Sequence, residues 1–156
     1  KCNVYTNIDE AIKYTEKYDF ITMWHVLEHV PNLNETLVQF NQLLSKKGKI
    51  IIAVPNLESY DAKYYKEYWA AYDLPIHLYH FSKKSICTLF EKHGFSLRKT
   101  KGMKFDSFYV SMLSEEHISG KKNFIKSIFV GIISNLYGLF GKDGFSSCIY
   151  VLERSK

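Results

Sequence analysis

The sequence predicts an open α/β fold in which most strands of the sheet are parallel and the last strand is antiparallel. Two observations support this fold class. Residues 49–54 (KIIIAV) are β-branched without alternation, which is typical of a strand buried on both faces. A helical pattern separates this run from an apolar run at residues 20–24 (FITMW), and strand, helix and strand within about 35 residues form a right-handed βαβ unit.

The first part of the chain predicts a helix and then a strand. Residues 8–17 carry apolar side chains at helical spacing. The preceding Val4 and Tyr5 are typical of a strand, and residues 20–24 have the length and apolar character of a buried one. We therefore expect two strands with a helix between them before His25.

The second helix is predicted over residues 32–44. Asn32 with Glu35 three residues later resembles a capping box, and apolar residues follow at helical spacing. We expect Gly48 to end this helix and Pro55 to stop the strand that comes next.

The rest of the chain predicts one more capped helix and two strands. Ser82 can cap the start of a helix, and Gly94 suits the position after its end, where a left-handed backbone favours glycine. Residues 96–101 resemble an edge strand. Residues 147–153 (SCIYVLE) alternate and predict the last strand.

The segment between these two strands is expected to be a helical insertion over about residues 103–143, within one partial domain of residues 1–156. Its residues 127–141 are uncharged and include three glycines. A helix that spans a membrane needs about 20 apolar residues, and this run is shorter. We expect residues 124–140 to form a buried or lid helix, with insertion at a membrane surface as the alternative.

The composition indicates a globular protein with a scattered basic surface. The chain has 156 residues, of which 46% are hydrophobic, and 21 Lys and Arg stand against 16 Asp and Glu. The basic residues are mostly isolated lysines, whereas nucleic-acid binders concentrate basic charge on one face, so we expect no nucleic-acid partner. The three cysteines form no C-x-x-C pair, which indicates a reduced, cytoplasmic protein.

Three stretches of the chain are placed where open α/β sheets bind their ligands, outside the carboxyl ends of the strands. They are residues 23–29, residues 56–60 and residues 72–81. The candidate site residues are therefore expected in these three stretches.

The first stretch contains His25, Glu28 and His29 in the pattern H-x-x-E-H, the inverted signature of zinc hydrolases. That chemistry needs both histidines on one helical face as metal ligands, with the glutamate as base. Pro31 leaves little helix to display the pattern. We therefore expect no metal site, and a zinc hydrolase is the weakest functional alternative.

Residues 18–57 resemble the middle of the class I S-adenosylmethionine-dependent methyltransferases, in the branch that carries an L-E-H motif. An acidic residue and an apolar strand come first, and at the spacing of that family follow Leu27-Glu28-His29, Gly48 and Pro55-Asn56. The resemblance continues more weakly over residues 73–95. It implies a Rossmann-like sheet, S-adenosylmethionine as cofactor, and methyl transfer to an oxygen or nitrogen of a small molecule.

The resemblance also implies roles for particular residues. The pattern D-x-P-x-H-L-x-H-F-S at residues 73–82 is similar to the active-site approach of this family, so His77 or His80 is expected to take a proton from the nucleophile. The alternative is that these histidines bond the backbone. The other expected contacts are cofactor contacts from Met23, Trp24 and His25, and substrate contacts from His29, Asn56 and Tyr79. For Trp24 the alternative is core packing.

The glycine-rich cofactor turn of the family does not occur in this sequence. There is no G-x-G-x-G, and no glycine precedes Gly48. Family order places this turn upstream of Lys1, so we expect a sheet truncated at its N-terminal half, in which Val4 and Tyr5 correspond to the third strand. We expect weak cofactor binding or none by this chain, and pairing of two copies through the exposed edge of the strand over residues 20–24.

The second functional hypothesis, after the methyltransferase and before the zinc hydrolase, is not an enzyme. It is a non-catalytic remnant, or partner-binding module, that keeps the sheet. Such a module would use the apolar residues 124–140 to bind a partner or a membrane surface.

Overall fold

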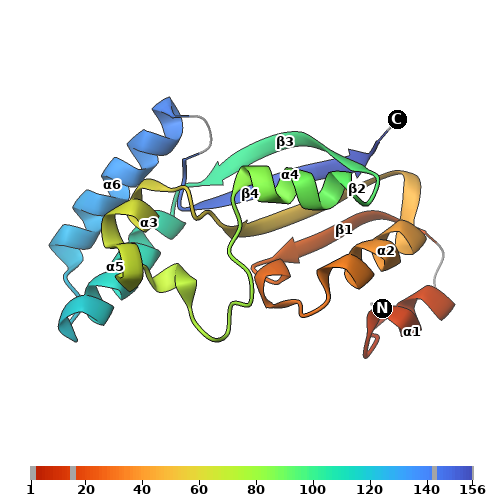
Figure 1. Ribbon diagram of the computed structural model, residues 1–156, viewed down its shortest axis with the longest axis horizontal. Coiled ribbons are helices and arrows are strands. Elements are labelled where there is room, and N and C mark those ends of the chain that lie inside the picture. Colours follow the sequence, from red (N-terminus) through yellow and green to blue (C-terminus); the bar gives the residue numbers. More distant parts are fainter. Residues whose placement is uncertain (1–2, 15–16, 142–143, 156) are drawn as a thin grey trace.

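The computed structural model describes residues 3–14, 17–141 and 144–155. Its body is a 4-stranded sheet in the order β1-β2-β4-β3 (Figure 1). The strands β1 and β2 are parallel, and β4 runs antiparallel to both of its neighbours, as predicted for the last strand. The strands are β1 (Tyr18–Trp24), β2 (Leu44–Pro55), β3 (Phe95–Met103) and β4 (Ser147–Arg154).

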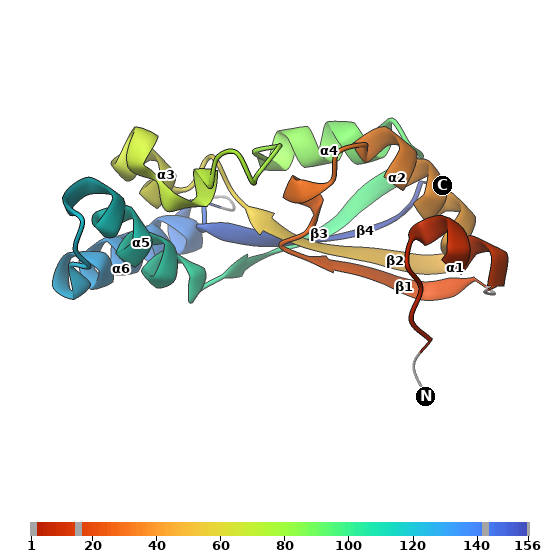
Figure 2. The ribbon, with the colours of Figure 1, turned by 90° about the horizontal axis from the view of Figure 1, so that it is seen from below.

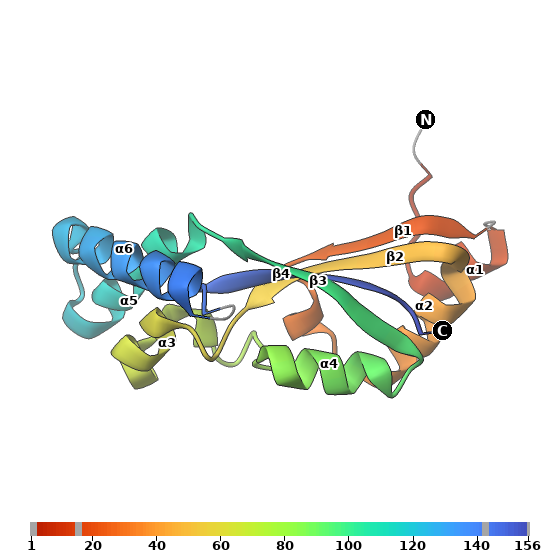
Figure 3. The same ribbon diagram turned by 90° about the horizontal axis from the view of Figure 1, so that it is seen from above.

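Helices cover one face of this sheet and gather beyond one of its ends. Figure 2 shows α1, α2 and α4 on the same side of the sheet, and Figure 3 shows no helix over the opposite face in the described part of the chain. The other helices, α3, α5 and α6, lie beyond the ends of β1 and β2. The helices are α1 (Ile8–Tyr14), α2 (Leu33–Leu43), α3 (Tyr60–Tyr65), α4 (Lys83–Glu91), α5 (Asp106–Ser119) and α6 (Phe124–Phe140).

The main core lies between the sheet and the helices α2 and α4. The β-branched run in β2 places Ile50 and Ile52 at its centre, both fully buried. Ile51, on the face that no described helix covers, is only partly buried, so the predicted burial on both faces is found only in part. From the helices, Leu37 of α2 and Phe90 of α4 pack into the same cluster. Burial of these apolar side chains is the main force that holds the helices on the sheet.

Three predictions about helices agree with the structure: one helix, one N-terminal cap and one C-terminal stop. The predicted helix over 8–17 is found as α1, and residues 15–16 lie outside the described residues. Ser82 caps α4 through a capping box with Ser85, whose amide donates to the Ser82 hydroxyl at 3.1 Å. Gly94 has a left-handed backbone (φ 80°), as the stop signal requires.

Three expectations about elements are wrong. Val4 and Tyr5 lie outside the four strands of the described sheet, and Val4 is 91% exposed. Asn32 makes no cap bond to the backbone and instead donates to the Glu35 carboxylate at 3.3 Å. Gly48 does not end α2, because the backbone is already extended at Leu44, and Gly48 lies inside β2.

The segment over residues 103–143 contains the two helices α5 and α6. The helix expected over residues 124–140 is found as α6. Its large apolar side chains are exposed, so the expectation that it is buried is wrong, whereas a lid helix and insertion at a membrane surface stay predictions. Across the described residues, every helix is too short or too polar to cross a bilayer.

Candidate functional site

The parallel strands β1 and β2 end side by side at Trp24 and Pro55, and the candidate site lies just beyond (Figure 1). His25 turns the chain away from β1 with a left-handed backbone (φ 51°), and its amide donates to the carbonyl of Ala53 at 2.9 Å. A residue other than glycine in this conformation is strained, and such strain is frequent at functional sites. A 3-10 helix over Leu27–His29 follows, so the L-E-H motif lies over the strand ends.

The side chain of His25 lies between two carboxylates. Its Nδ1 is 3.3 Å from Oε1 of Glu28, and its Nε2 is 3.3 Å from Oδ2 of Asp106, the first residue of α5. The hydrogen bond with Asp106, and next the one with Glu28, raise the pKa of His25 to about 9, although burial acts in the opposite direction. The imidazole is therefore protonated at neutral pH and brings a positive charge into the site.

The two carboxylates have different surroundings. Glu28 is 1% exposed, and apart from the ion pair with His25 neither of its carboxylate oxygens has a hydrogen-bond partner among the described residues. For Asp106, burial raises the pKa, but the hydrogen bond and the charge of His25 lower it below its ordinary value. A buried carboxyl with so few partners needs a neighbouring cation, which His25 supplies.

A cavity of about 530 Å³ opens beside this charged group. A hollow of about 710 Å³ lies elsewhere, next to Lys66 and Leu74, but no histidine lines it. The smaller cavity combines apolar walls with a few polar groups, which is the usual make-up of a small-molecule site. Its walls are Pro55, Ala70, Ala71, Val110 and Leu113, and its polar lining is His25, Asp73, His77, Asp106, Tyr109, His117 and Ser147.

The two histidines that the sequence offered as bases have different surroundings in the structure. His77 lines the cavity, with its Nδ1 2.8 Å from the carbonyl oxygen of Ala71 and its Nε2 3.9 Å from Oδ2 of Asp73. A carbonyl accepts only from a protonated nitrogen, so this contact leaves the Nε2 of a neutral His77 unprotonated. His80 is not among the lining residues, and its Nε2 is 2.9 Å from the carbonyl oxygen of Tyr72.

The expected cofactor residues lie at the end of β1. Met23 is buried in the main core, so it can offer a ligand its backbone but little of its side chain. Trp24 is 52% exposed, so the alternative of core packing does not describe its indole. His25 is the charged neighbour of the cavity.

The expected substrate residues hold the surrounding loops to one another. The Nδ1 of His29 is 3.2 Å from the carbonyl oxygen of Ile76. The Tyr79 hydroxyl donates to the carbonyl of Pro31 at 3.0 Å. The buried amide of Asn56 donates to the carbonyl of Phe145 at 3.0 Å and accepts from the amide of Glu58 at 3.1 Å. None of these three side chains lines the cavity beside His25.

A group that could hold a metal ion overlaps the H-x-x-E-H pattern only in part. Ligand atoms of Glu28, His29 and His77 all lie within 4.8 Å of one another. His25, which the zinc-hydrolase pattern requires as a ligand, is instead engaged with Asp106. The 3-10 helix over Leu27–His29 is too short to place His25 and His29 on one helical face. The geometry therefore does not support the zinc-hydrolase arrangement.

Three polar lining residues come from α5 and were not foreseen from the sequence. They are Asp106, Tyr109 and His117, in a segment where no motif is recognisable. The spacing of Asp106 and Tyr109 places both on one helical face, which is a signal that the sequence does contain. Nothing in the sequence indicates that this face meets the end of β1.

One family of known proteins matches the chain. A family model described as a methyltransferase domain matches residues 2–100. These residues include the L-E-H motif and His77 and end before α5. Among curated proteins, no sequence matches this chain.

Solved structures share the fold at low sequence identity. A SAM-dependent methyltransferase from Thermotoga maritima is 17% identical with a TM-score of 0.55, over 90% of this chain and 57% of that one. A SAM-dependent methyltransferase from Archaeoglobus fulgidus is 16% identical with a TM-score of 0.53, over 97% of this chain and 66% of that one. A cyclopropane synthase from Mycobacterium tuberculosis is 12% identical with a TM-score of 0.50, over 90% and 56%. The chain spans about half the length of the solved structures that it matches.

Proposed function

The chain belongs to the methyltransferase domain family, and from this membership we propose that it is part of an enzyme that uses S-adenosylmethionine to methylate an oxygen or nitrogen of a small molecule. The observation that carries the proposal is the cavity beyond the ends of β1 and β2, lined by His77, His25 and Asp106. Open α/β sheets bind their ligands at this edge. The size of the cavity suits a small molecule.

Part of the cofactor's binding surface is present on this chain. Trp24 and Val26 expose apolar side chains at the end of β1, where the methionine end of the cofactor would lie. When bound, the cofactor supplies a methyl group already activated on a sulfonium sulfur. The chain's own contribution is therefore to align the acceptor, exclude water and remove a proton.

We assign the removal of that proton to His77. Its Nδ1 is held by the carbonyl of Ala71, which leaves the lone pair of Nε2 available to a nucleophile in the cavity. The carboxylate of Asp73, 3.9 Å from Nε2, would stabilise the imidazolium that results. His25 is already protonated at neutral pH and cannot serve as this base.

Other residues support proposals for the cellular compartment of the protein and for the pairing of two copies. We propose a cytoplasmic protein, because the three cysteines of the sequence lie far apart and form no C-x-x-C pair, as is usual in a reducing compartment. We also propose that two copies pair through β1, an edge strand of the described sheet on which Phe20 and Trp24 are exposed. A monomer by light scattering at micromolar concentration would contradict this pairing.

Calorimetric titration with S-adenosylhomocysteine tests the function. The chain is compared with a version extended upstream by its natural sequence. Binding by the extended version, with weak binding or none by the chain, is the expected result, because the glycine-rich turn of the family does not occur in these residues. Absence of binding in both proteins would overturn the methyltransferase and favour a non-catalytic, partner-binding module.

A further inference from the structure

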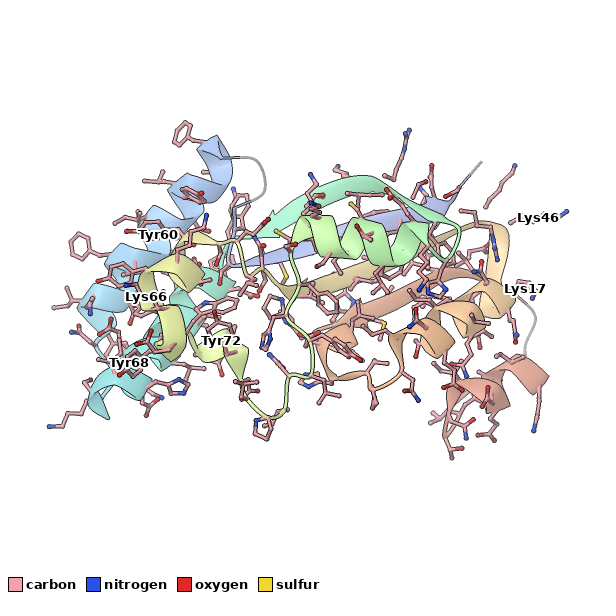
Figure 4. All side chains as sticks on the ribbon, in the orientation of Figure 1. Lys17, Lys46, Tyr60, Lys66, Tyr68 and Tyr72 are labelled. Atoms are coloured by element: carbon pink, nitrogen blue, oxygen red, sulfur yellow. The ribbon has the colours of Figure 1, made fainter. Side chains whose placement is uncertain are left out.

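Helix α6 has an inverted distribution of side chains. A surface helix normally turns its apolar side chains toward the core, whereas one side of α6 is apolar and exposed along all 17 residues. Figure 4 shows the side chains on this side of α6 pointing away from the rest of the molecule. The outer face, as we call it, is formed by Ile125, Ile128, Phe129, Ile132, Leu136 and Phe140.

The inner face of α6 consists of small residues that sit against the body of the protein. Ser127, Gly131, Ser134 and Gly138 are all buried. A Cβ atom on Gly131 would lie 2.5 Å from the ring of Phe108, so only glycine allows this close approach. Small residues inside with large apolar residues outside is the pattern of helices that face lipid.

Polar bonds fix the rotation of α6 about its axis. The Ser134 hydroxyl donates to Oδ1 of the buried Asp61 at 2.6 Å. The carbonyl of Gly131 accepts from the Ser107 hydroxyl at 3.1 Å, and Asn135 donates to the carbonyl of Lys104 at 2.8 Å. The helix cannot roll its apolar face inward without breaking these bonds, so the exposure of the outer face is built into the fold.

Lysine and tyrosine side chains border the outer face. Along the border with α3, Lys63 lies over the ring of Tyr137 at 5.0 Å, and Lys126 lies over the ring of Tyr64 at 5.7 Å. Tyr60 lies between α3 and α6, next to Tyr137 (Figure 4). Tyrosine and lysine are the residues that anchor proteins at the headgroup level of a bilayer.

The residues just before α6 are positively charged, like the lysines that border the outer face. Lys121 and Lys122 precede the helix, and α6 itself contains no acidic residue. Glu115 pairs with Lys126 at 2.8 Å and Glu116 with Lys122 at 3.8 Å. The excess positive charge beside the outer face therefore rests on Lys121 and Lys63. A surface of this kind is complementary to anionic headgroups.

We propose that the outer face of α6 binds a lipid bilayer that carries anionic headgroups, with the helix axis parallel to the membrane plane. Its length, about 25 Å at 1.5 Å per residue, and its bonded inner face are incompatible with a lipid-surrounded span. A protein partner would also be expected to find about one hydrogen bond per 100–200 Å², and the outer face offers no polar side chain. Lipid tails form no hydrogen bonds, so they need no polar side chain on the helix.

Co-sedimentation of the chain with vesicles tests this proposal. We expect the chain to bind phosphatidylcholine vesicles that contain about 30% phosphatidylserine, and to bind pure phosphatidylcholine less well. In the double variant Phe129→Ser/Ile132→Ser the bound fraction should fall about tenfold or more, because two large apolar side chains no longer enter the bilayer. Lys121→Ser/Lys122→Ser should reduce binding to the anionic vesicles and leave the weaker binding to phosphatidylcholine.

The matched control removes exposed apolar side chains elsewhere. Val38→Ser/Ile76→Ser should bind vesicles like the original chain, since these exposed residues lie on α2 and in the loop before α4, away from α6. Equal vesicle binding by this control and the α6 variant, or no binding by the original chain, would overturn the proposal. An oligomer that Phe129→Ser/Ile132→Ser dissociates, without vesicle binding, would do so as well and would assign the outer face to a second copy.

A second measurement does not depend on removing apolar side chains. The variant Phe129→Trp places an indole on the outer face, and the variant Val38→Trp places one on α2. Quenching of the first, and not of the second, by lipids brominated in the acyl chain is expected when α6 enters the membrane. Equal quenching of both would contradict the orientation that we propose.

Discussion

The Nε2 atom of His25 and the Oδ2 atom of Asp106 lie 3.3 Å apart, although His25 directly follows β1 and Asp106 begins α5. This contact connects the part of the chain that matches the methyltransferase family to a helix that lies beyond the match. It places a cation between two carboxyl groups at the edge of a cavity. The charge state of the site therefore depends on a residue that the family motifs do not contain.

The first prediction concerns the pKa of His25. In the variant Asp106→Asn we expect this pKa to fall from about 9, because the bond with Asp106 is the largest cause of its rise. An NMR titration of the imidazole measures the change. The control Glu91→Gln removes an acid on α4 that has no contact with His25, and it should leave the pKa unchanged. An equal titration curve in Asp106→Asn and the original chain would contradict the ion pair.

The same group makes stability depend on pH. A histidine whose pKa rises on folding contributes fully below its ordinary pKa of 6.5, and the contribution is lost as the pH rises through the folded value of about 9. We expect the free energy of unfolding from this group to decrease over that window by about 1 kcal/mol or less, since the pair is partly exposed and screened. Urea unfolding at several pH values tests this, and Asp106→Asn should show a smaller decrease.

The second prediction concerns the buried carboxylate of Asp61. It accepts hydrogen bonds from Trp69 at 2.8 Å, Ser134 at 2.6 Å and Ser146 at 2.7 Å, and so joins α3, α6 and the start of β4. We expect Asp61→Ala to lower the free energy of unfolding by about 3 kcal/mol or more, because three buried donors lose their acceptor. Denaturant unfolding measures it. Asp19→Ala, at an exposed carboxyl of β1, is the control and should cost far less.

The third prediction concerns the ring of Phe145. A Cβ atom on Gly102 would lie 2.0 Å from this ring, and one on Gly138 would lie 2.6 Å from it. We expect Gly138→Ala to destabilise the chain by about 2 kcal/mol, because the ring has no room to move. The double variant Gly138→Ala/Phe145→Leu should lose less than the sum of the two single changes. Additive losses would show that the contact between the added methyl group and the Phe145 ring does not cause the loss of stability in Gly138→Ala.

The fourth prediction separates His77 from His80 in the upstream-extended protein. We expect His77→Gln to lower kcat about a hundredfold or more, because a general base contributes on this scale. His80→Gln is the matched control. Its contact with the carbonyl of Tyr72 predicts a loss of stability of about 1 kcal/mol and a nearly unchanged kcat. The reverse pattern would move the role of base to His80.

Local patterns predicted much of the sheet because its elements depend mainly on nearby residues. The β-branched run at residues 49–54 became the buried part of β2, and the Ser82 cap and Gly94 stop both hold. Gly48 failed as a stop signal because pairing with Tyr18 of β1 extends the backbone already from Leu44. Val4 lies outside the four strands of the described sheet, and a strand needs a neighbour that supplies its hydrogen bonds.

The candidate site was predictable only in part. The loop after the first strand and the segment with His77 were expected at the carboxyl ends of the strands, and the structure brings His25 and His77 to one cavity. It does not bring Asn56, Tyr79 or His80 to that cavity, because their polar groups bond the backbone of neighbouring loops. Such bonds depend on loop geometry, which no periodicity in the sequence encodes.

The sequence by itself determined the βαβ unit, the antiparallel last strand and the L-E-H motif, because these follow from residue spacing along a short stretch of chain. Only the tertiary structure decided that α5 brings Asp106 to His25 and that α6 exposes its large apolar side chains. Both depend on contacts between distant segments: Asp106 beside the end of β1, and Ser134 on the buried Asp61. The apolar residues of α6 have the same spacing whichever way the helix faces, and its rotation is set by the glycines and hydrogen bonds of its inner face.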